Sequence, residues 1–229
     1  MRSILNQLKE GLIVSCQPVV GGPMDRPEIV AAFARAAIDG GAAGLRIEGL
    51  ENLRAVRAVT DVPIIGLLKV DLTDSPVRIT PSLSDAQALV SAGADIVAFD
   101  ATDRPRPVPV IGLVEAVHAG GALAMADCAN ADDGRRAVAL GCEVLGSTLS
   151  GYTDGPIPDG PDLYLVRALS QMPGFVIAEG RYQAPRDAAE GLRAGADAVV
   201  AGSAITRPEH VTQWFVSAMA SERAKRVAP

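Results

Sequence analysis

The sequence is poor in the residues from which metal centres and disulfide frameworks are built. Its 229 residues include two histidines and three cysteines. Cys16, Cys128 and Cys142 are odd in number and widely spaced, with no CxxC pair, so they predict neither a disulfide framework nor a zinc site. His118 and His210 lie far apart in helical stretches, and we expect neither to be catalytic. We therefore expect no metal and a reducing, cytoplasmic compartment.

Long apolar runs are also missing. No segment approaches the roughly 18 apolar residues of a membrane span, and the first residues, MRSILNQLKEG, lack the apolar core of a signal peptide. The 21 basic and 27 acidic residues give a net charge of −6 and a pI near 5.0, which argues against a nucleic-acid or membrane partner. Because 48% of the residues are hydrophobic, the chain can bury a large core, and we expect one soluble domain over residues 1–229.

Lysine is the scarcest of the charged residues. Lys9, Lys69 and Lys225 stand against 18 arginines, and the first and last of them fall in the terminal segments. Lys69 ends the apolar run PIIGLLK. Burial disfavours an ammonium and lowers its pKa, which suits a lysine to proton transfer or to Schiff-base formation. A structural lysine at the rim of the fold is the alternative interpretation.

A repeat of about 50 residues organises the chain. Four segments combine small residues, a glycine and a β-rich run, and a second set of apolar runs lies between them. The first set covers residues 40–49, 91–102, 139–151 and 193–206, and the second covers 11–17, 62–69, 121–128 and 174–181. Short, nearly continuous apolar runs are typical of parallel strands that are buried on both faces, so eight such strands are predicted.

The intervening stretches have the periodicity of helices. Apolar residues recur at spacings of three and four over residues 31–41, 84–94, 132–141 and 185–196. Ser84 and Asp132 are the expected N-caps. This alternation predicts an α/β fold, a single-domain (β/α)8 TIM barrel. A doubly wound open sheet is the alternative, but no GxGxxG follows the first predicted strand. The proline-rich segments 103–110 and 153–162 are expected to form loops over the active face.

Chemistry in such a barrel gathers at the carboxyl ends of the strands. We expect Glu179 to orient Lys69, to act as a second acid/base or to hold a hydroxyl of the substrate, with a salt bridge to Lys69 or Arg181 as the alternative. Arg46 could clamp a carbonyl or carboxylate, and Asp127 is a less specific candidate. The polar and glycine residues at the predicted strand ends are Gln17, Arg46, Lys69, Asp71, Asp100, Thr102, Asp127, Thr148, Ser150, Glu179, Arg181, Gly202 and Ser203.

The last two predicted strands end in segments that suit a phosphate. These are AEGR (178–181) and VVAGSAITRP (199–208). Glycines let backbone N–H groups approach an anion, and a helix that starts after Gly202 would add its N-terminal partial charge. Gly180, Arg181, Gly202 and Ser203 are therefore the candidate phosphate ligands, with tight turns as the alternative. Arg207 could add a charged contact or simply face solvent.

The motifs GLIVSCQ, PIIGLLKVD, DSPVRITP, DATDRPRP, MADC, STLSGYT, VIAEGRY and GSAITRPEHVTQWF follow one another along most of the chain. In this order they resemble the N-acetylmannosamine-6-phosphate 2-epimerases of bacterial sialic acid catabolism. Three positions differ from the common pattern of that family. Val70 follows Lys69 where many members have arginine, Ile47-Glu48 replaces an asparagine-like position, and Ala129-Asn130 replaces a Ser-Thr pair.

The resemblance implies a TIM barrel of the phosphosugar-binding type that interconverts N-acetylmannosamine 6-phosphate and N-acetylglucosamine 6-phosphate without a cofactor. It implies that Lys69 removes and returns the proton at C2, with assistance from Glu179. By the same resemblance, Gln17, Arg46, Asp127 and Arg207 bind substrate, and Gly180, Arg181, Gly202 and Ser203 bind phosphate. Members are often homodimers, so the tail 210–229, whose segment 210–220 carries the only tryptophan, is expected to pack in a dimer or to close its own barrel.

Two other functions remain open at the level of sequence. Lys69 could form an imine, as in a phosphosugar aldolase, or the barrel could bind a phosphosugar without turnover. For an epimerase, the ring-opened sugar is the expected reactive form, because C2–H is acidic only when C1 is a carbonyl.

Overall fold

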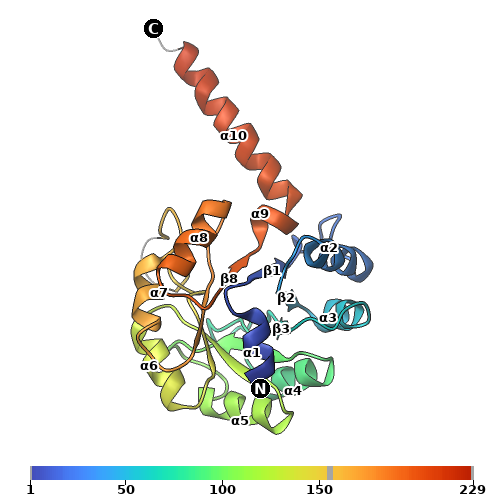
Figure 1. The fold of residues 1–229 in the computed structure, drawn as a ribbon, viewed down its shortest axis with the longest axis vertical. Coiled ribbons are helices and arrows are strands. Elements are labelled where there is room, and N and C mark those ends of the chain that lie inside the picture. Colours follow the sequence, from blue (N-terminus) through green and yellow to red (C-terminus); the bar gives the residue numbers. More distant parts are fainter. Residues whose placement is uncertain (1, 154–156, 228–229) are drawn as a thin grey trace.

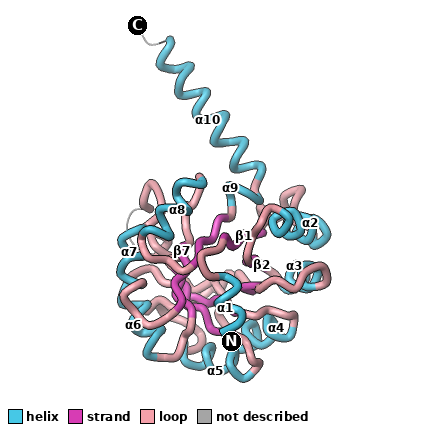
Figure 2. The backbone as a smooth tube through the Cα atoms, viewed as in Figure 1, coloured by secondary structure: helices cyan, strands magenta, loops and turns pink. Residues whose placement is uncertain are grey.

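The computed structural model describes residues 2–153 and 157–227. Eight parallel strands close into a barrel in sequence order, with β8 paired to β1 (Figures 1 and 2). The TIM-barrel prediction is confirmed and the open sheet is excluded. The strands are β1 (Leu12–Cys16), β2 (Gly44–Glu48), β3 (Ile64–Leu67), β4 (Ile96–Asp100), β5 (Leu123–Asp127), β6 (Val144–Gly146), β7 (Phe175–Ala178) and β8 (Ala198–Ala201).

Side chains of each strand alternate between two cores. One set points outward and packs against the surrounding helices, as Leu45 and Ile47 of β2 do. The other set fills the barrel lumen and includes Ile65 and Leu67 of β3 and Ile177 of β7. This period of two explains why the strands read as continuous apolar runs, since both faces are buried.

Helices α2 (Pro27–Asp39), α3 (Leu50–Arg57), α4 (Leu83–Ser91), α5 (Val110–Ala119), α6 (Ala131–Ala139), α7 (Leu163–Leu169) and α8 (Pro185–Arg193) surround the barrel (Figure 2). The expected N-caps at Ser84 and Asp132 are wrong by two residues. Ser82 caps α4 and Asn130 caps α6, each in a capping box with the acidic residue three positions later. The box satisfies two backbone N–H groups at once, which a cap inside the helix would leave unpaired.

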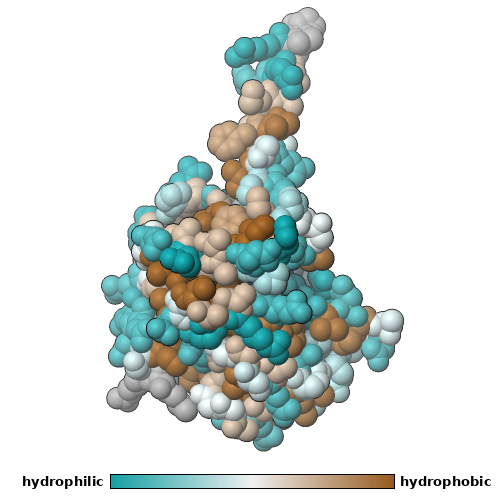
Figure 3. Space-filling model, turned by 90° about the vertical axis from the view of Figure 1, so that its right-hand side faces the viewer, coloured by the Kyte–Doolittle hydropathy of each residue, from teal (hydrophilic) through white to brown (hydrophobic). Residues whose placement is uncertain are grey.

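The two ends of the chain have different roles in the fold. Helix α1 (Arg2–Leu8) carries Ile4, Leu5 and Leu8 into the apolar cluster of the lumen. Helix α9 (Ser203–Thr206) leads into α10 (Pro208–Val227), which extends away from the barrel (Figures 1 and 3). Among the described residues, no helix has the length and apolar character needed to cross a bilayer.

The two proline-rich segments follow β4 and β6, as expected. Residues 101–109 form an irregular loop after β4, and the loop after β6 continues to α7, with residues 154–156 outside the described part of the chain. Both loops therefore start at the carboxyl face of the barrel.

Candidate active site

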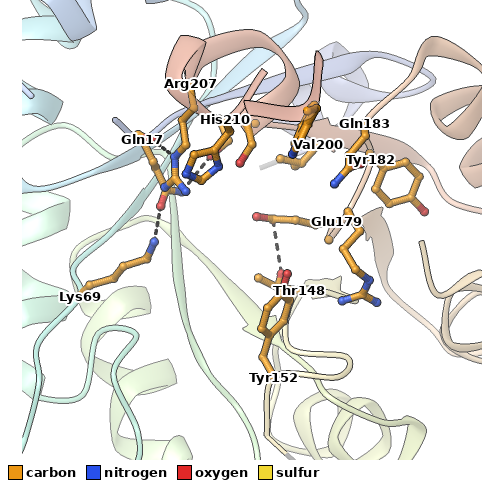
Figure 4. Close-up of a pocket in the computed structure, with 16 residues that line it drawn as sticks. Gln17, Lys69, Thr148, Tyr152, Glu179, Tyr182, Gln183, Val200, Arg207 and His210 are labelled. Atoms are coloured by element: carbon orange, nitrogen blue, oxygen red, sulfur yellow. Dashed lines mark hydrogen bonds between the residues drawn. The ribbon is translucent and has the colours of Figure 1, made fainter. Parts of the chain in front are cut away.

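Two adjoining cavities of about 410 Å³ each open at the carboxyl face of the barrel. Gln17, Lys69, Thr148, Glu179 and Arg207 line both of them (Figure 4). Most of the other predicted strand-end residues line one of the two, but Asp71, Thr102, Asp127 and Ser150 line neither. The first cavity extends toward the ends of β7 and β8, and the second toward β2, β4 and the loop after β3. Apart from Arg207, which follows α9 (Ser203–Thr206), each of these side chains arrives there because its residue has the lumen-facing parity of its strand.

Lys69 lies two residues beyond β3, not within it as predicted. Its backbone forms an antiparallel bridge with Ile79, and Val70 N–H donates to the Arg78 carbonyl at 2.9 Å. This short antiparallel ribbon places the lysine at the edge of the cavities, where its ammonium donates to Gln17 Oε1 at 2.6 Å.

The surroundings of Lys69 favour its neutral form. Although Lys69 is exposed to the cavity, its pKa is lowered, first by loss of solvent around the ammonium and then by the positive charges of Arg46 and Arg207.

Gln17 directs the contact with Lys69. Its Nε2 donates to Ser15 Oγ at 2.9 Å, which turns Oε1 toward the lysine. Its backbone carbonyl accepts from Arg207 Nε at 2.6 Å. Gln17 is buried, so both contacts hold a fixed geometry. Gln17 thus links Lys69, through its side chain, to Arg207, through its backbone carbonyl.

Arg46, Asp127 and Glu179 form a buried ionic network. Arg46 donates to Asp127 Oδ1 at 3.1 Å and to Oδ2 at 2.6 Å, and its NH1 lies 2.7 Å from Glu179 Oε2. Arg46 is 1% exposed. Its guanidinium therefore clamps a carboxylate of its own chain, which differs from the expected clamp on a substrate group. Glu179 pairs with Arg46, whereas we had expected any salt bridge of Glu179 to involve Lys69 or Arg181.

The network changes the ionisation of Glu179. Burial and the charge of Asp127 raise the Glu179 pKa to about 7, against the opposing effects of Arg46, Lys69 and Thr148. Thr148 Oγ1 lies 2.6 Å from Asp127 Oδ1 and 3.3 Å from Glu179 Oε2. A carboxyl group with a pKa near neutrality can both give and take a proton at physiological pH.

Gly146 makes room for these contacts. A Cβ at this position would stand 2.9 Å from Thr148 Oγ1 and 3.2 Å from Asp127 Oδ1. It would also meet Met125 Cε at 2.6 Å. Because Gly146 has lumen-facing parity on β6, only a glycine leaves space there for the threonine and the aspartate to meet.

The β7 end of the site turns sharply. Gly180 has φ +104° and Arg181 has φ +62°, so the chain leaves the strand in a left-handed conformation. The Arg181 side chain donates to the carbonyls of Ser150 and Gly160, each at 2.7 Å, and lies 5.4 Å from the centre of the Tyr152 ring. The guanidinium thus holds the loop after β6.

The β8 end contributes Gly202 and Ser203. The helix expected to start there is the four-residue α9, too short to develop much of a dipole. Thr206 Oγ1 donates to the Ser15 carbonyl at 2.7 Å and fixes α9 against β1. Within the described part of the chain, no hydrogen bond engages the backbone N–H of Gly180, Arg181, Gly202 or Ser203. These donors border the first cavity.

Sequence reasoning missed several residues that line the first cavity. His210 was placed in a helix away from the strand ends, yet α10 begins so soon after β8 that its first turn borders the cavity. Its position three residues after Arg207, within one helical turn, is the signal that could have found it. The other missed residues are Ser15, Tyr152, Tyr182, Gln183, Val200 and Trp214.

The positions that depart from the family pattern have structural roles. Ile47 faces outward and is fully buried, while Glu48 Oε1 accepts from the backbone N–H of Lys69 at 3.4 Å. Asn130 caps α6. None of these changes displaces Lys69 or Glu179 from the cavities.

The chain also resembles known proteins over nearly its full length. Residues 30–221 match the protein family described as N-acetylmannosamine-6-phosphate epimerase. An N-acetylmannosamine-6-phosphate 2-epimerase of Proteus mirabilis is 61% identical over 213 residues, which cover 93% of this chain and 92% of that protein. A protein of the same name from Haemophilus influenzae is 53% identical over 222 residues, 97% of each chain. The solved structure of the N-acetylmannosamine-6-phosphate 2-epimerase from Clostridium perfringens superimposes with a TM-score of 0.90 at 37% identity, covering 93% of this chain and 95% of that one. The chain therefore belongs to the N-acetylmannosamine-6-phosphate epimerase family.

Proposed function

We propose that this protein inverts C2 of N-acetylmannosamine 6-phosphate, giving N-acetylglucosamine 6-phosphate, by proton transfer at Lys69 and Glu179. As a member of the family, the protein is a sugar-phosphate 2-epimerase, an isomerase. The observation that carries the mechanism is the placement of the two groups: Lys69 follows β3 and Glu179 follows β7, across the barrel from one another, and both line both cavities. An inversion needs proton donors and acceptors on both faces of one carbon, and this arrangement provides them.

The reaction needs no group beyond the protein's own acids and bases. In the ring-opened sugar, the C1 carbonyl makes the C2 proton acidic. One base takes this proton, the C2–H electron pair forms the C1–C2 double bond, and the negative charge passes to the C1 oxygen. Delivery of a proton to the opposite face of C2 restores the carbonyl and inverts the centre. Positioned proton transfer of this kind contributes about 10²–10⁴-fold to the rate.

Lys69 as the neutral amine and Glu179 as the carboxyl group form the acid/base pair. Loss of solvent around the lysine ammonium favours its neutral form, and the raised pKa of Glu179 keeps a proton available. Gln17 orients the lysine through their 2.6 Å contact. Arg46 holds the carboxyl group of Glu179 and lines the second cavity, and Asp127, which lines neither cavity, holds Arg46 from the buried side. No step in this scheme requires a cofactor.

The phosphate binds at the ends of β7 and β8. Backbone N–H groups of Gly180, Arg181, Gly202 and Ser203 supply the hydrogen bonds, and Arg207 supplies the charge. This position anchors C6 and leaves C2 between Lys69 and Glu179, so binding energy from the phosphate is converted into orientation at the reacting carbon.

Incubation with N-acetylmannosamine 6-phosphate in D₂O, followed by proton NMR, tests substrate and mechanism together. Turnover by the wild type should place deuterium at C2. Lys69→Met and Glu179→Gln should each slow exchange by about 10²–10⁴-fold, whereas Lys9→Met, which alters an exposed lysine of the same chain, should not. Turnover without deuterium at C2 would overturn proton transfer. Borohydride treatment in the presence of substrate tests the aldolase alternative, because only an imine at Lys69 would be trapped as a covalent adduct. Binding of the sugar phosphate without any deuterium exchange would identify a non-catalytic phosphosugar receptor.

A homodimer built through α10 is a further part of the proposal. Phe215, Val216 and Met219 are 69%, 56% and 66% exposed on this helix, which extends from the barrel with apolar residues along its middle (Figure 3). Light scattering should give twice the chain mass for the wild type and the monomer mass for Phe215→Ser with Met219→Ser, with Gln213→Ser as the polar control. A monomeric wild type would contradict the dimer. The three free cysteines support placement of the enzyme in the cytoplasm.

A further inference from the structure

The two cavities diverge from the acid/base pair. The first leads to the backbone N–H groups at the ends of β7 and β8, and the second leads past Arg46 toward the loops after β3 and β4. Only the second is lined by Pro76, Ile79, Asp100 and Arg104. A substrate longer than either cavity can therefore place its two ends in different chemical environments.

The order of atoms in the sugar decides which end goes where. This step rests on the proposed function, in which the phosphate on C6 occupies the first cavity and C2 lies between Lys69 and Glu179. The chain from C3 to C6 then leads toward β7 and β8. The C1 oxygen and the nitrogen substituent on C2 must project in the opposite direction, which is the second cavity.

The second cavity offers both apolar and polar contacts to that substituent. Pro76, Ile79 and Leu149 supply apolar surface. Arg104 supplies a cation whose position is fixed, because its Nε donates to Thr102 Oγ1 at 2.9 Å and its NH2 lies 2.5 Å from the buried carboxylate of Asp100. Among the described residues, Arg104 NH1 donates no hydrogen bond, so this donor is available to a ligand.

The size of the cavity exceeds what an acetyl group needs. At about 30 Å³ for each water-sized group, the three heavy atoms of an acetyl occupy on the order of 90 Å³. The cavity measures about 410 Å³ and must also accept C1 and its oxygen. Space remains for an acyl chain that is longer by at least one heavy atom.

We infer that the second cavity is the subsite for the N-acyl group, that it accepts acyl groups larger than acetyl, and that Arg104 selects those with a terminal hydroxyl. The substrate class is then the 6-phosphates of N-acylated 2-amino-2-deoxyhexoses, with the N-hydroxyacetyl compound as the best of the larger ones. The hydroxyacetyl and propanoyl groups have nearly the same shape and differ by a hydroxyl in place of a methyl. Their comparison therefore isolates the hydrogen bond to Arg104 from the effect of size.

The test compares the N-acetyl, N-hydroxyacetyl and N-propanoyl forms of mannosamine 6-phosphate by C2 deuteration in D₂O. A closely fitting pocket rejects one extra methylene by roughly 10–200-fold, whereas here kcat/KM for the propanoyl form should stay within about tenfold of the acetyl form. A hydrogen bond to a charged group should favour hydroxyacetyl over propanoyl by about tenfold or more. Arg104→Met should abolish that preference, chiefly through KM.

Arg106→Met is the matched control. Arg106 also binds Asp100, with its NH2 3.0 Å from Oδ1, but it does not line the second cavity. It should leave the hydroxyacetyl-to-propanoyl ratio unchanged, so a general effect on the loop after β4 is separated from a contact to substrate. If Arg104→Met fails to fold, Leu149→Phe keeps the size argument testable, because a larger side chain in the cavity should lower the propanoyl-to-acetyl ratio.

The outcomes distinguish the inference from the function on which it rests. Absence of turnover of the N-acetyl compound overturns the proposed function itself. Normal turnover of the N-acetyl compound, with the propanoyl form slower by more than about tenfold, overturns the claim that the subsite accepts larger acyl groups and leaves the epimerase intact. An unchanged hydroxyacetyl-to-propanoyl ratio in Arg104→Met overturns the role of Arg104.

Discussion

Arg46 and Asp127 form a bidentate ion pair across the barrel lumen, with N–O distances of 3.1 and 2.6 Å. Arg46 belongs to β2 and Asp127 to β5, and neither side chain is more than 1% exposed. Asp127 raises the pKa of Glu179, whereas Arg46 lowers it. Burial raises that pKa most, and the pair therefore adjusts the proton affinity of the carboxyl group that we propose as catalytic, while Arg46 holds its position.

Removal of Asp127 should be costly for stability. Asp127→Ala leaves a buried guanidinium without its bidentate partner, and broken buried pairs cost about 3–5 kcal/mol of the free energy of unfolding. Urea denaturation measures this loss. Asp132→Ala, which removes an exposed partner of Arg135, should cost about 1 kcal/mol or less, and equal losses in the two variants would contradict the importance of burial.

The pH dependence of kcat/KM should be bell-shaped. In the proposed mechanism, inversion needs one member of the Lys69–Glu179 pair protonated and the other deprotonated, in either direction. Both are protonated in acid, so the acid limb should fall at about pH 7, the pKa of Glu179. Both are deprotonated in alkali, so the second limb should fall below 10.5, the ordinary lysine value.

Asp127→Asn provides the diagnostic shift in that profile. Its lost negative charge should lower the pKa of Glu179 and move the acid limb to lower pH, while the alkaline limb stays in place. The substrate phosphate itself titrates with a second pKa of about 6, and its limb would be common to wild type and variant. An acid limb that does not move in Asp127→Asn would contradict assignment of that limb to Glu179.

Much of the fold was predictable because it depends on local pattern. Continuous apolar runs identified all eight strands, and the polar residues that follow them, such as Lys69 and Glu179, do reach one site. Side chains alternate between the two faces of a strand, and this alternation continues for two residues after each strand ends. Applied to β6, it would also have marked Gly146 and Thr148 as lumen-facing.

The partners of these residues were not predictable from the sequence. Arg46 and Asp127 are 81 residues apart and meet only because the barrel closes with a particular register. The sequence therefore left Arg46 available to bind substrate, although its guanidinium is engaged. His210 was missed for a related reason, since the direction of α10 after the short α9 decides whether its first turn borders the cavity.

The cysteines should be chemically inert in the folded enzyme. All three are buried, and burial raises the pKa of Cys16 and of Cys142 to about 12 and that of Cys128 well above its ordinary value. Because the thiolate is the reactive form, a disulfide reagent at pH 8 should label no thiol and leave activity intact. In urea all three should react. Rapid loss of activity in native buffer would contradict this account of Cys128, which follows Asp127.

Gly146→Ala should damage catalysis more than a glycine substitution elsewhere. The added Cβ would crowd Thr148 Oγ1 at 2.9 Å and Asp127 Oδ1 at 3.2 Å. Met125 can move its terminal methyl, but Thr148 can retreat only by giving up its contacts with Asp127 and Glu179. Overpacking of this kind costs about 1–3 kcal/mol of the free energy of unfolding, and displacement of a catalytic group by ~1 Å can lower the rate roughly 10²-fold.

The control for that substitution is Gly112→Ala, within α5. There the new Cβ would meet Leu83 Cδ2 at 3.4 Å, an ordinary contact, and alanine is the better helix former by roughly 0.5–1 kcal/mol. This variant should keep wild-type kcat and unchanged or higher stability. If Gly146→Ala likewise retained full kcat and stability, the cavity would have to tolerate a methyl group between Asp127 and Thr148. The network could then not be what holds Glu179 in the position that the proposed mechanism requires.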